Sequence, residues 1–287
     1  MKPFFYIISM FPKSFFVYLV DFYLYTKLYK FFKTYKITKI NIEIAYPDLN
    51  RFDLEQVSKL SIRESIISGF ETIFTWGRNE THSNTKIFKV KNNFLLKKQF
   101  EGGDGLIAVA IHNRSVDMLL KWINSNITTV SLYKKVKNKS LENFVKKDRE
   151  ASGSTSVQTS IGGVRKIFKA LKENKAICFA ADQVPQRGLG EYVKFFNRDA
   201  YTTTLVQSLA IKTKAPVIYF YINSNKANFL SVTVKQCSES IYDDSEHILL
   251  INNDIEKMIN ERPIDYSWEY KRFKRSRHPD KDPYSSI

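Results

Sequence analysis

Residues that build metal centres and disulfide scaffolds are scarce in this sequence. Its 287 residues include only two cysteines, Cys178 and Cys237, and contain no Cys-x-x-Cys pair or histidine cluster. Cys178 lies inside an apolar run, which is typical of a buried core thiol. The sequence therefore indicates no disulfide framework and no metal site, and it fits a reducing location that faces the cytosol.

Two loops that mark large enzyme classes are also missing. The sequence has no Gly-x-Ser-x-Gly elbow, the turn that carries the nucleophile of α/β-hydrolases. It has no glycine-rich loop of the kind that binds nucleotide phosphates either. A serine hydrolase is therefore poorly supported, and no nucleotide site is indicated.

The amino-terminal segment lacks a long uninterrupted apolar run. Residues 3–35 are rich in Phe, Tyr, Leu, Ile and Val, but Pro12-Lys13 and Asp21 interrupt them, so no stretch reaches the roughly 18–20 uncharged residues of a spanning helix. No small-residue cleavage site follows, which argues against a secretory signal. Lysines then recur at three-residue spacing among aromatic residues: Lys27, Lys30, Lys33, Lys36 and Lys39. This pattern predicts a basic, aromatic helix lying in a membrane interface; a core helix with one solvated lysine face is the alternative.

Positive charge is in clear excess. The chain has 45 Lys and Arg against 29 Asp and Glu, a formal net charge of +16, and its 43% hydrophobic content is typical of a folded protein. A cation of this size is attracted to nucleic acid, anionic lipid or phosphorylated substrates. No nucleic-acid-binding motif accompanies the charge, so we expect no nucleic-acid partner, although a non-enzymatic basic module remains an alternative.

Apolar runs alternate with helical patterns along most of the chain. Three continuous apolar runs predict strands that are buried on both faces, namely Leu106–Ile111, Ala176–Ala181 and Pro216–Tyr221. Weaker strand patterns cover Lys86–Val90, Thr128–Tyr133 and Phe229–Val234. Helical patterns cover Asp53–Thr75, Met118–Ile123, Leu141–Glu150, Val164–Lys172, Thr202–Thr213 and Glu246–Asn260. The alternation predicts an α/β fold with a central, mostly parallel sheet wrapped by helices.

The predicted organisation has two parts. We expect a membrane-associated helical segment over residues 1–40 and an α/β domain over residues 41–287. Within the second part, Asn41–Asn50 reads as a loop, Asp53 as a helix N-cap and Trp76–Thr85 as a polar connection.

His112 and Asp117 form the candidate catalytic pair. His112 directly follows the first buried strand, and ligands of open α/β sheets bind at the carboxyl ends of the strands. Residues five apart on a regular helix lie about 140° from one another, so the two can meet only if His112 sits on the turn and Asp117 in the first helical turn. There Asp117 would accept from one ring nitrogen and leave the other as a general base. By itself, a His–Asp pair at this spacing is common by chance.

Three further landmarks follow this pair in order. Ala181-Asp182-Gln183-Val184-Pro185 ends the second buried strand, and Tyr192–Phe196, Ala200–Thr204 and Leu209–Val217 come after it. The others are Gly163-Val164-Arg165, leading into Ala170–Glu173, and Asp265–Trp268, continuing to Lys271–Lys274. With these landmarks the sequence resembles the late lauroyl and myristoyl acyltransferases of lipid A biosynthesis, within the wider group of acyltransferases that carry His, four residues, then Asp or Glu. The resemblance covers most of residues 105–278.

The resemblance implies roles for several residues of this chain. It implies His112 as the base and Asp117 as its orienting carboxylate. Arg149 would bind phosphate or stabilise an oxyanion, with a surface salt bridge as the alternative. The remaining candidates for substrate binding are Arg165, Asp182, Gln183, Arg272 and Lys274. For Asp182 the alternative is a helix cap or turn residue, and for the two basic residues near the carboxyl terminus it is a solvated tail.

The implied reaction moves a fatty acyl chain from an acyl carrier protein, or from acyl-CoA, to a hydroxyl of a membrane glycolipid such as a lipid A precursor, and it requires no metal and no tightly bound cofactor. The expected location is the cytoplasmic face of a bacterial inner membrane, against its anionic surface. Three positions depart from the family's habit: Asp117 replaces Glu, Ser115-Val116 replaces Asn-Trp, and Asn197 replaces Gly. These departures leave a lysophospholipid, an aminolipid or a surface-polysaccharide sugar open as acceptor.

Overall fold

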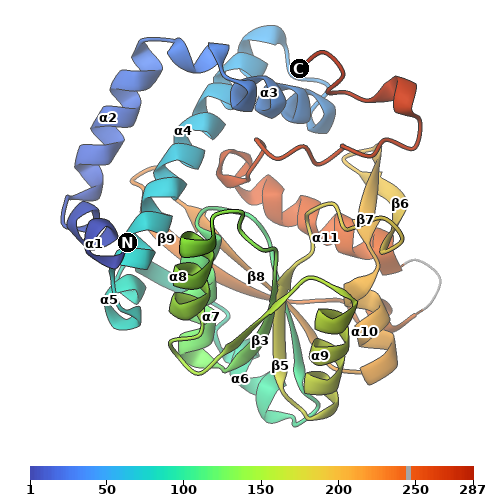
Figure 1. Ribbon diagram of the computed structural model, residues 1–287. Coiled ribbons are helices and arrows are strands. Elements are labelled where there is room, and N and C mark those ends of the chain that lie inside the picture. Colours follow the sequence, from blue (N-terminus) through green and yellow to red (C-terminus); the bar gives the residue numbers. More distant parts are fainter. Residues whose placement is uncertain (244–246) are drawn as a thin grey trace.

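Within residues 1–243 and 247–287, which the computed structural model describes, seven strands form a sheet between two layers of helices (Figure 1). The strands are β1 (Ile87–Lys91), β2 (Leu106–Ala110), β3 (Thr129–Tyr133), β4 (Thr155–Gln158), β5 (Ala176–Ala180), β8 (Val217–Ser224) and β9 (Leu230–Gln236). Their order is β1-β9-β8-β2-β5-β3-β4. Neighbours run parallel except β8 and β9, which are antiparallel. The predicted α/β fold with a mostly parallel sheet is confirmed.

The three continuous apolar runs of the sequence occupy the middle of the sheet. They form β8, β2 and β5, which are adjacent, and every residue of β2 is buried. Alternate residues of a strand point to opposite faces. Ile107 and Val109 accordingly pack in one hydrophobic core with residues of the later helices, whereas Ala108 and Ala110 pack in another with residues that follow β2. A strand covered on both faces has no polar positions, which explains why these runs are uninterrupted.

Helices cover both faces of the sheet and extend beyond one end of it (Figure 1). Those of the amino-terminal part are α1 (Lys2–Ser9), α2 (Lys13–Tyr25), α3 (Lys33–Ala45), α4 (Arg51–Gly77) and α5 (Glu80–Asn84). Those that follow are α6 (Phe94–Glu101), α7 (Val116–Asn126), α8 (Lys139–Arg149), α9 (Ile161–Lys172), α10 (Leu205–Thr213) and α11 (His247–Glu261). Short 3-10 helices cover Leu28–Phe31, Glu239–Tyr242, Pro263–Asp265 and Pro279–Lys281. A separate hairpin consists of β6 (Gly190–Phe195) and β7 (Arg198–Thr203).

Several predicted boundaries differ from the structure. The expected loop over Asn41–Asn50 is wrong over its first half, because α3 continues to Ala45. Asn50, and not Asp53, caps α4: its side-chain oxygen accepts from the Asp53 backbone N–H at 2.9 Å. The expected helix over Thr202–Thr213 begins only at Leu205, because its first residues complete β7.

Three further expectations concern shorter stretches. The polar connection over Trp76–Thr85 contains the short helix α5. The β6–β7 hairpin was not predicted as strands, although its aromatic and Thr-rich sequence was singled out. Glu246, the predicted first residue of the last helix, lies outside the described residues, and α11 covers His247–Glu261.

The amino-terminal segment is not one continuous basic helix. It consists of α1, α2, a 3-10 turn and α3, and Lys27 has a left-handed backbone with φ 58° between α2 and that turn. No single helix among the described residues is long and apolar enough to cross a membrane. The α1–α2 pair meets the length and composition requirement only jointly, with a bend of 86°. The predicted boundary at residue 40 falls inside α3, and membrane association stays a prediction.

Candidate active site

The imidazole of His112 pairs with the carboxylate of Asp182. His112 Nδ1 lies 2.7 Å from Asp182 Oδ1, and the His112 backbone N–H donates to Oδ2 at 2.9 Å. The sheet explains this meeting: β2 and β5 are parallel neighbours with Ala110 opposite Ala180, and each functional residue follows two positions later. The two residues therefore leave the sheet at the same level of its carboxyl edge, where ligands of such folds bind.

The contacts of the ring fix its tautomer. The Gln183 side-chain Nε2, which can only donate, lies 3.0 Å from His112 Nε2. In the neutral ring, Nδ1 carries the proton that is donated to the Asp182 carboxylate, which leaves Nε2 to accept from the Gln183 amide. Such an imidazole has a lone pair on Nε2, as a general base requires, and a carboxylate behind it to stabilise the cation formed on protonation.

Electrostatics in this pair favour the charged forms. Burial lowers the pKa of His112, but the Asp182 carboxylate, by its charge and its hydrogen bond, outweighs burial and leaves the pKa raised. For Asp182, burial raises the pKa, whereas the neighbouring His112 and the more distant Arg272 charge lower it, and the net shift is downward. The carboxylate is thus ionised beside the ring at neutral pH.

The structure corrects the expected partner of His112. Asp117, in the first turn of α7, accepts from Arg149 Nε at 2.8 Å, while the carboxylate at His112 Nδ1 is that of Asp182. Arg149 ends α8, and its pairing with Asp117 raises its pKa despite burial. Asp117 therefore holds an arginine, whose positive charge in turn lowers the pKa of His112. This matches the salt-bridge alternative for Arg149, but the pair lies inside the site.

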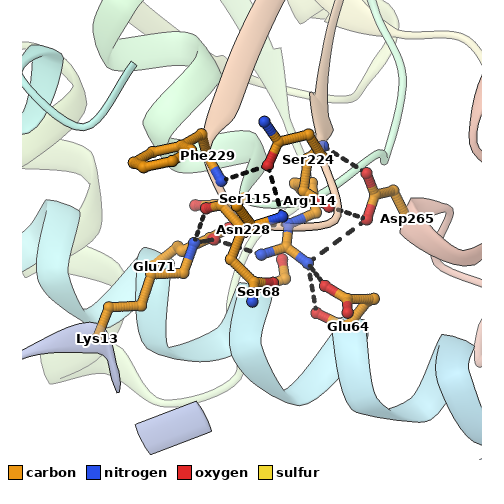
Figure 2. A network of polar contacts seen from close by, with 12 residues as sticks. Lys13, Glu64, Ser68, Glu71, Arg114, Ser115, Ser224, Asn228, Phe229 and Asp265 are labelled. Atoms are coloured by element: carbon orange, nitrogen blue, oxygen red, sulfur yellow. Dashed lines mark hydrogen bonds and ion pairs between the residues drawn. The ribbon is translucent and has the colours of Figure 1, made fainter. Parts of the chain in front are cut away.

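A buried arginine beside His112 was missed at the sequence level. Arg114 is 3% exposed and has a left-handed backbone with φ 56°. Its guanidinium lies at the centre of a polar network that Figure 2 shows, with ion pairs to Glu64, Glu71 and Asp265. Charges so buried are tolerated only with partners. An arginine two residues after a strand-end histidine gives no sign of this network, because its partners come from α4 and the carboxyl-terminal part.

The carboxyl-terminal segment clamps the turn that carries His112. The His112 carbonyl accepts from the Ser267 N–H at 3.0 Å, and the Arg114 N–H donates to the Asp265 carbonyl at 3.0 Å. Between them, Asn113 and Tyr266 form an antiparallel bridge. These backbone contacts, together with the guanidinium network, fix the turn on two sides and so hold His112 in a defined position.

His112 and Arg149 line a cavity of about 600 Å³ at the carboxyl edge of the sheet. Its apolar wall comes from Ala110, Val116, Leu120, Leu132, Cys178, Phe179, Ala180, Val184, Pro185 and Leu205. Its cationic wall comes from Lys134, Lys135, Arg149, Lys274 and Arg275, and among the described residues that line it none is acidic. Burial raises the pKa of the Cys178 thiol to about 12, so this side chain stays protonated and is a poor nucleophile. The cavity suits an anionic molecule with an apolar chain.

A strand-end histidine paired with a carboxylate, an apolar wall and a cationic wall fit acyl transfer to an anionic acceptor. Comparison with known proteins agrees: the model of the family described as bacterial lipid A biosynthesis acyltransferase matches residues 3–275. The chain belongs to this family. The predicted resemblance to lipid A acyltransferases is thereby confirmed.

Two curated members of the lipid A acyltransferase family show how distant the similarity is. A lipid A biosynthesis acyltransferase of Haemophilus influenzae is 23% identical over 252 residues, which is 86% of this chain and 79% of that protein. The lipid A biosynthesis palmitoleoyltransferase of Escherichia coli is 22% identical over 242 residues, which is 83% of this chain and 78% of that protein.

The other residues that the acyltransferase resemblance implied are spread more widely. Gln183 contacts His112, and Lys274 lines the cavity with its Nζ 4.5 Å from the Tyr270 ring centroid. Arg165 is exposed on α9. Arg272 is 2% exposed and donates to the Tyr201 carbonyl at 2.9 Å. The described residues that line the cavity include neither Arg165 nor Arg272, so the structure does not bring these two to it.

The departure at Asn197 from the acyltransferase family's usual glycine has a structural explanation. Phe196 and Asn197 form the turn of the β6–β7 hairpin, with φ values of 45° and 60°. Left-handed backbone favours glycine, and asparagine is the side chain that tolerates it best. The turn geometry is therefore accessible to this chain without the glycine.

Proposed function

We propose that this chain transfers a fatty acyl group from a thioester of acyl carrier protein to a hydroxyl of a lipid A precursor, with His112 as general base and Asp182 as its orienting carboxylate. Membership in the family supports an acyltransferase that acts in lipid A biosynthesis. The observation that carries the finer proposal is the His112–Asp182 pair, in which Nδ1 faces the carboxylate while His112 lines a cavity that has apolar and cationic walls.

The proposed reaction is a direct transfer. The acceptor hydroxyl takes the place of the Gln183 amide at His112 Nε2 and gives its proton to that nitrogen as its oxygen bonds to the thioester carbonyl carbon. Asp182 stabilises the imidazolium. When the tetrahedral intermediate collapses, the carbon–sulfur bond breaks and the thiolate takes the proton from Nε2. Arg149, held by Asp117 on the cavity wall, is placed to stabilise the oxyanion or to bind a phosphate of the acceptor.

The charges of the chain support the choice of substrates. The five cations of the cavity wall would bind the phosphates of a lipid A precursor or the phosphorylated arm of the carrier. The net charge of +16 would attract an acidic carrier protein and an anionic bilayer. Relatives of this family suggest a membrane-associated bacterial enzyme, and we place this chain at the cytoplasmic face of the inner membrane.

The proposal is tested by acyl transfer from acyl carrier protein to a purified lipid A precursor, with His112→Ala, Asp182→Asn and wild type compared. We expect the first variant to lose activity by about 10³-fold or more, because no other base replaces the imidazole. An exposed-site variant of the same type, His278→Ala in the basic tail, serves as control and should keep wild-type activity. Near-wild-type transfer by His112→Ala would contradict the proposal.

A lysophospholipid is the second candidate acceptor. Asp117 in place of Glu is the habit of glycerolipid acyltransferases, and this departure is the observation that favours it. Mass spectrometry of lipids from cells with and without the gene separates the two, since loss of one acyl chain is expected either in lipid A or in phospholipid. An aminolipid or polysaccharide acceptor would show in the same experiment.

A further inference from the structure

A second cavity, of about 810 Å³, lies beneath the bend between α1 and α2. Its floor is apolar and deeply buried, and consists of Phe70, Phe74, Met118 and Leu230, each at most 6% exposed. Its rim is apolar but exposed, and consists of Phe11, Tyr18, Phe88 and Phe229, each at least 47% exposed. The volume is within the usual range for a ligand pocket, and a hollow with a buried apolar floor and an exposed aromatic rim suits a hydrocarbon chain.

This cavity is distinct from the one that contains His112. The two share no lining residue among the described part of the chain. Helix α7 separates them: Val116 and Leu120, four residues apart, face the first cavity, whereas Met118 between them faces the second. A ligand in the second cavity therefore does not occupy the catalytic position.

Around the second cavity, the acidic residues have ion-pair partners, whereas two of the cations have none in the described chain. Its two acidic residues are already paired: Asp21 binds Arg63, and Glu71 binds Arg114 and Lys13. Its other two cations, Arg78 and Lys86, make no ion pair with any described residue. They instead lie over aromatic rings, with Arg78 Cζ 4.5 Å from the Tyr6 ring centroid and Lys86 Nζ 5.1 Å from that of Phe74.

The guanidinium of Arg78 has N–H donors that are not used in hydrogen bonds within the described part of the chain. Its Nη2 donates to the Ser9 carbonyl at 3.2 Å, while its Nε is buried without a hydrogen-bond partner among the described residues. A buried N–H without an acceptor costs free energy, so an anion that completes the contacts of this side chain would be favoured. Two unpaired cations beside an apolar hollow form a site for an anionic group joined to a chain.

We propose that this cavity binds one acyl chain of an anionic phospholipid from the bilayer, with its phosphate held by Arg78 and Lys86. The exposed aromatic residues of α1 and α2 lie next to the rim, so the opening is on the side of the molecule that we expect to face the membrane. The inference goes beyond the proposed function and does not depend on it.

Native mass spectrometry of the full chain in detergent micelles tests the proposal, with dioleoyl phosphatidylglycerol as the probe and phosphatidylcholine of the same chains as its neutral counterpart. We expect one tightly retained phosphatidylglycerol. Arg78→Gln combined with Lys86→Gln should weaken its binding about tenfold or more, since both charge-assisted contacts are lost. Ala227→Trp, at the exposed mouth, should weaken it by obstruction with the charges intact.

The matched control is Arg51→Gln with Lys172→Gln, which removes the same net charge. Both residues are exposed away from the cavity, and Lys172 Nζ also lies over a phenylalanine ring, that of Phe168. This variant and His112→Ala should bind like wild type, and circular dichroism checks that each variant is folded. Equal retention of phosphatidylcholine, full displacement by inorganic phosphate, or unchanged binding in the folded Ala227→Trp variant would each overturn the proposal.

Discussion

At the scale of single residues, His112 owes its basicity to a carboxylate that comes from a different strand. Because Asp182 raises its pKa above the ordinary value of about 6.5, the neutral imidazole forms only as the pH rises through that raised pKa. If neutral His112 is the base, kcat/KM increases with pH over this range. Asp117 influences the ring only indirectly, through the charge of Arg149.

Asp182→Asn should shift the acid limb of the kcat/KM profile to lower pH. The variant removes the charge that raises the pKa of His112, and burial then lowers this pKa. The plateau should fall by about 10²–10⁴-fold, because the imidazolium formed during transfer loses its counter-charge. Steady-state rates between pH 5 and 9 measure both effects. An acid limb that stays in place in Asp182→Asn but moves down in pH in Asp117→Asn would show that Asp117 is the partner of His112 during turnover.

Arg114→Met should destabilise the fold by about 3 kcal/mol, because it removes the buried charge that three carboxylates share and leaves each with only one, more exposed, cation: Arg63, Lys13 or Arg262. Glu64, Glu71 and Asp265 all face this guanidinium (Figure 2). Urea unfolding measures the loss, and Arg114→Lys should lose less because it keeps the charge. Lys146→Met, which breaks an exposed ion pair with Glu150, should cost at most about 1 kcal/mol. Equal losses in the two Met variants would contradict a structural role for the buried network.

Asp182 and Asp117 show which part of the candidate site the sequence could predict. His112 and Asp182 were both recognised as strand-end residues, because a buried strand leaves an unmistakable apolar run before each. Their direct contact could not be predicted, since β3 and β4 come between β2 and β5 in the chain and only the sheet order makes the two strands neighbours. Spacing along the sequence favoured Asp117 instead.

At the scale of elements, burial decided what the sequence could predict. β2, β5 and β8 were located within a few residues because both of their faces are covered. The β6–β7 hairpin lies outside the main sheet and mixes charged, aromatic and Thr residues, so neither helical nor strand periodicity marks it. Helix α3 extends into the expected loop, where Asn41 and Ile42 are buried against later parts of the chain, and this tertiary contact has no local sequence signal.

The turn of the β6–β7 hairpin tests whether left-handed backbone restricts the choice of residue at Asn197. Asn197, at φ 60°, should tolerate replacement by Gly with a change of no more than a few tenths of a kcal/mol, whereas Asn197→Val should cost about 1–2 kcal/mol. Thermal or urea unfolding measures both. The outcome that contradicts the argument is a Val variant as stable as wild type, since a β-branched side chain is strained in left-handed backbone.

At the scale of the whole molecule, apolar surface is concentrated at the amino-terminal end. Helix α2 buries Val20 and Leu24, but leaves most of its aromatic residues in solvent, and Phe22 and Tyr25 are 62% and 82% exposed. A core helix with one solvated face would instead bury its aromatic residues and expose its charged ones. The exposed aromatics, together with the positive net charge, favour the membrane-interface reading of residues 1–40 over the core-helix alternative.

Phe22→Ser combined with Phe31→Ser should therefore weaken binding to vesicles that contain phosphatidylglycerol by about tenfold or more, because each exposed ring would bury apolar surface in the interface. Both side chains are at least 62% exposed, so their loss should leave the unfolding free energy nearly unchanged. Phe94→Ser with Ile161→Ser removes exposed apolar groups from α6 and α9, 66% and 69% exposed, and should bind vesicles like wild type. Co-sedimentation at low and high salt separates the apolar contribution, which salt does not screen, from the attraction between the basic chain and the anionic surface, which it does. If both double variants lost binding equally, the contact would be unspecific; if neither did, the amino-terminal helices would not be the membrane-binding part of this acyltransferase.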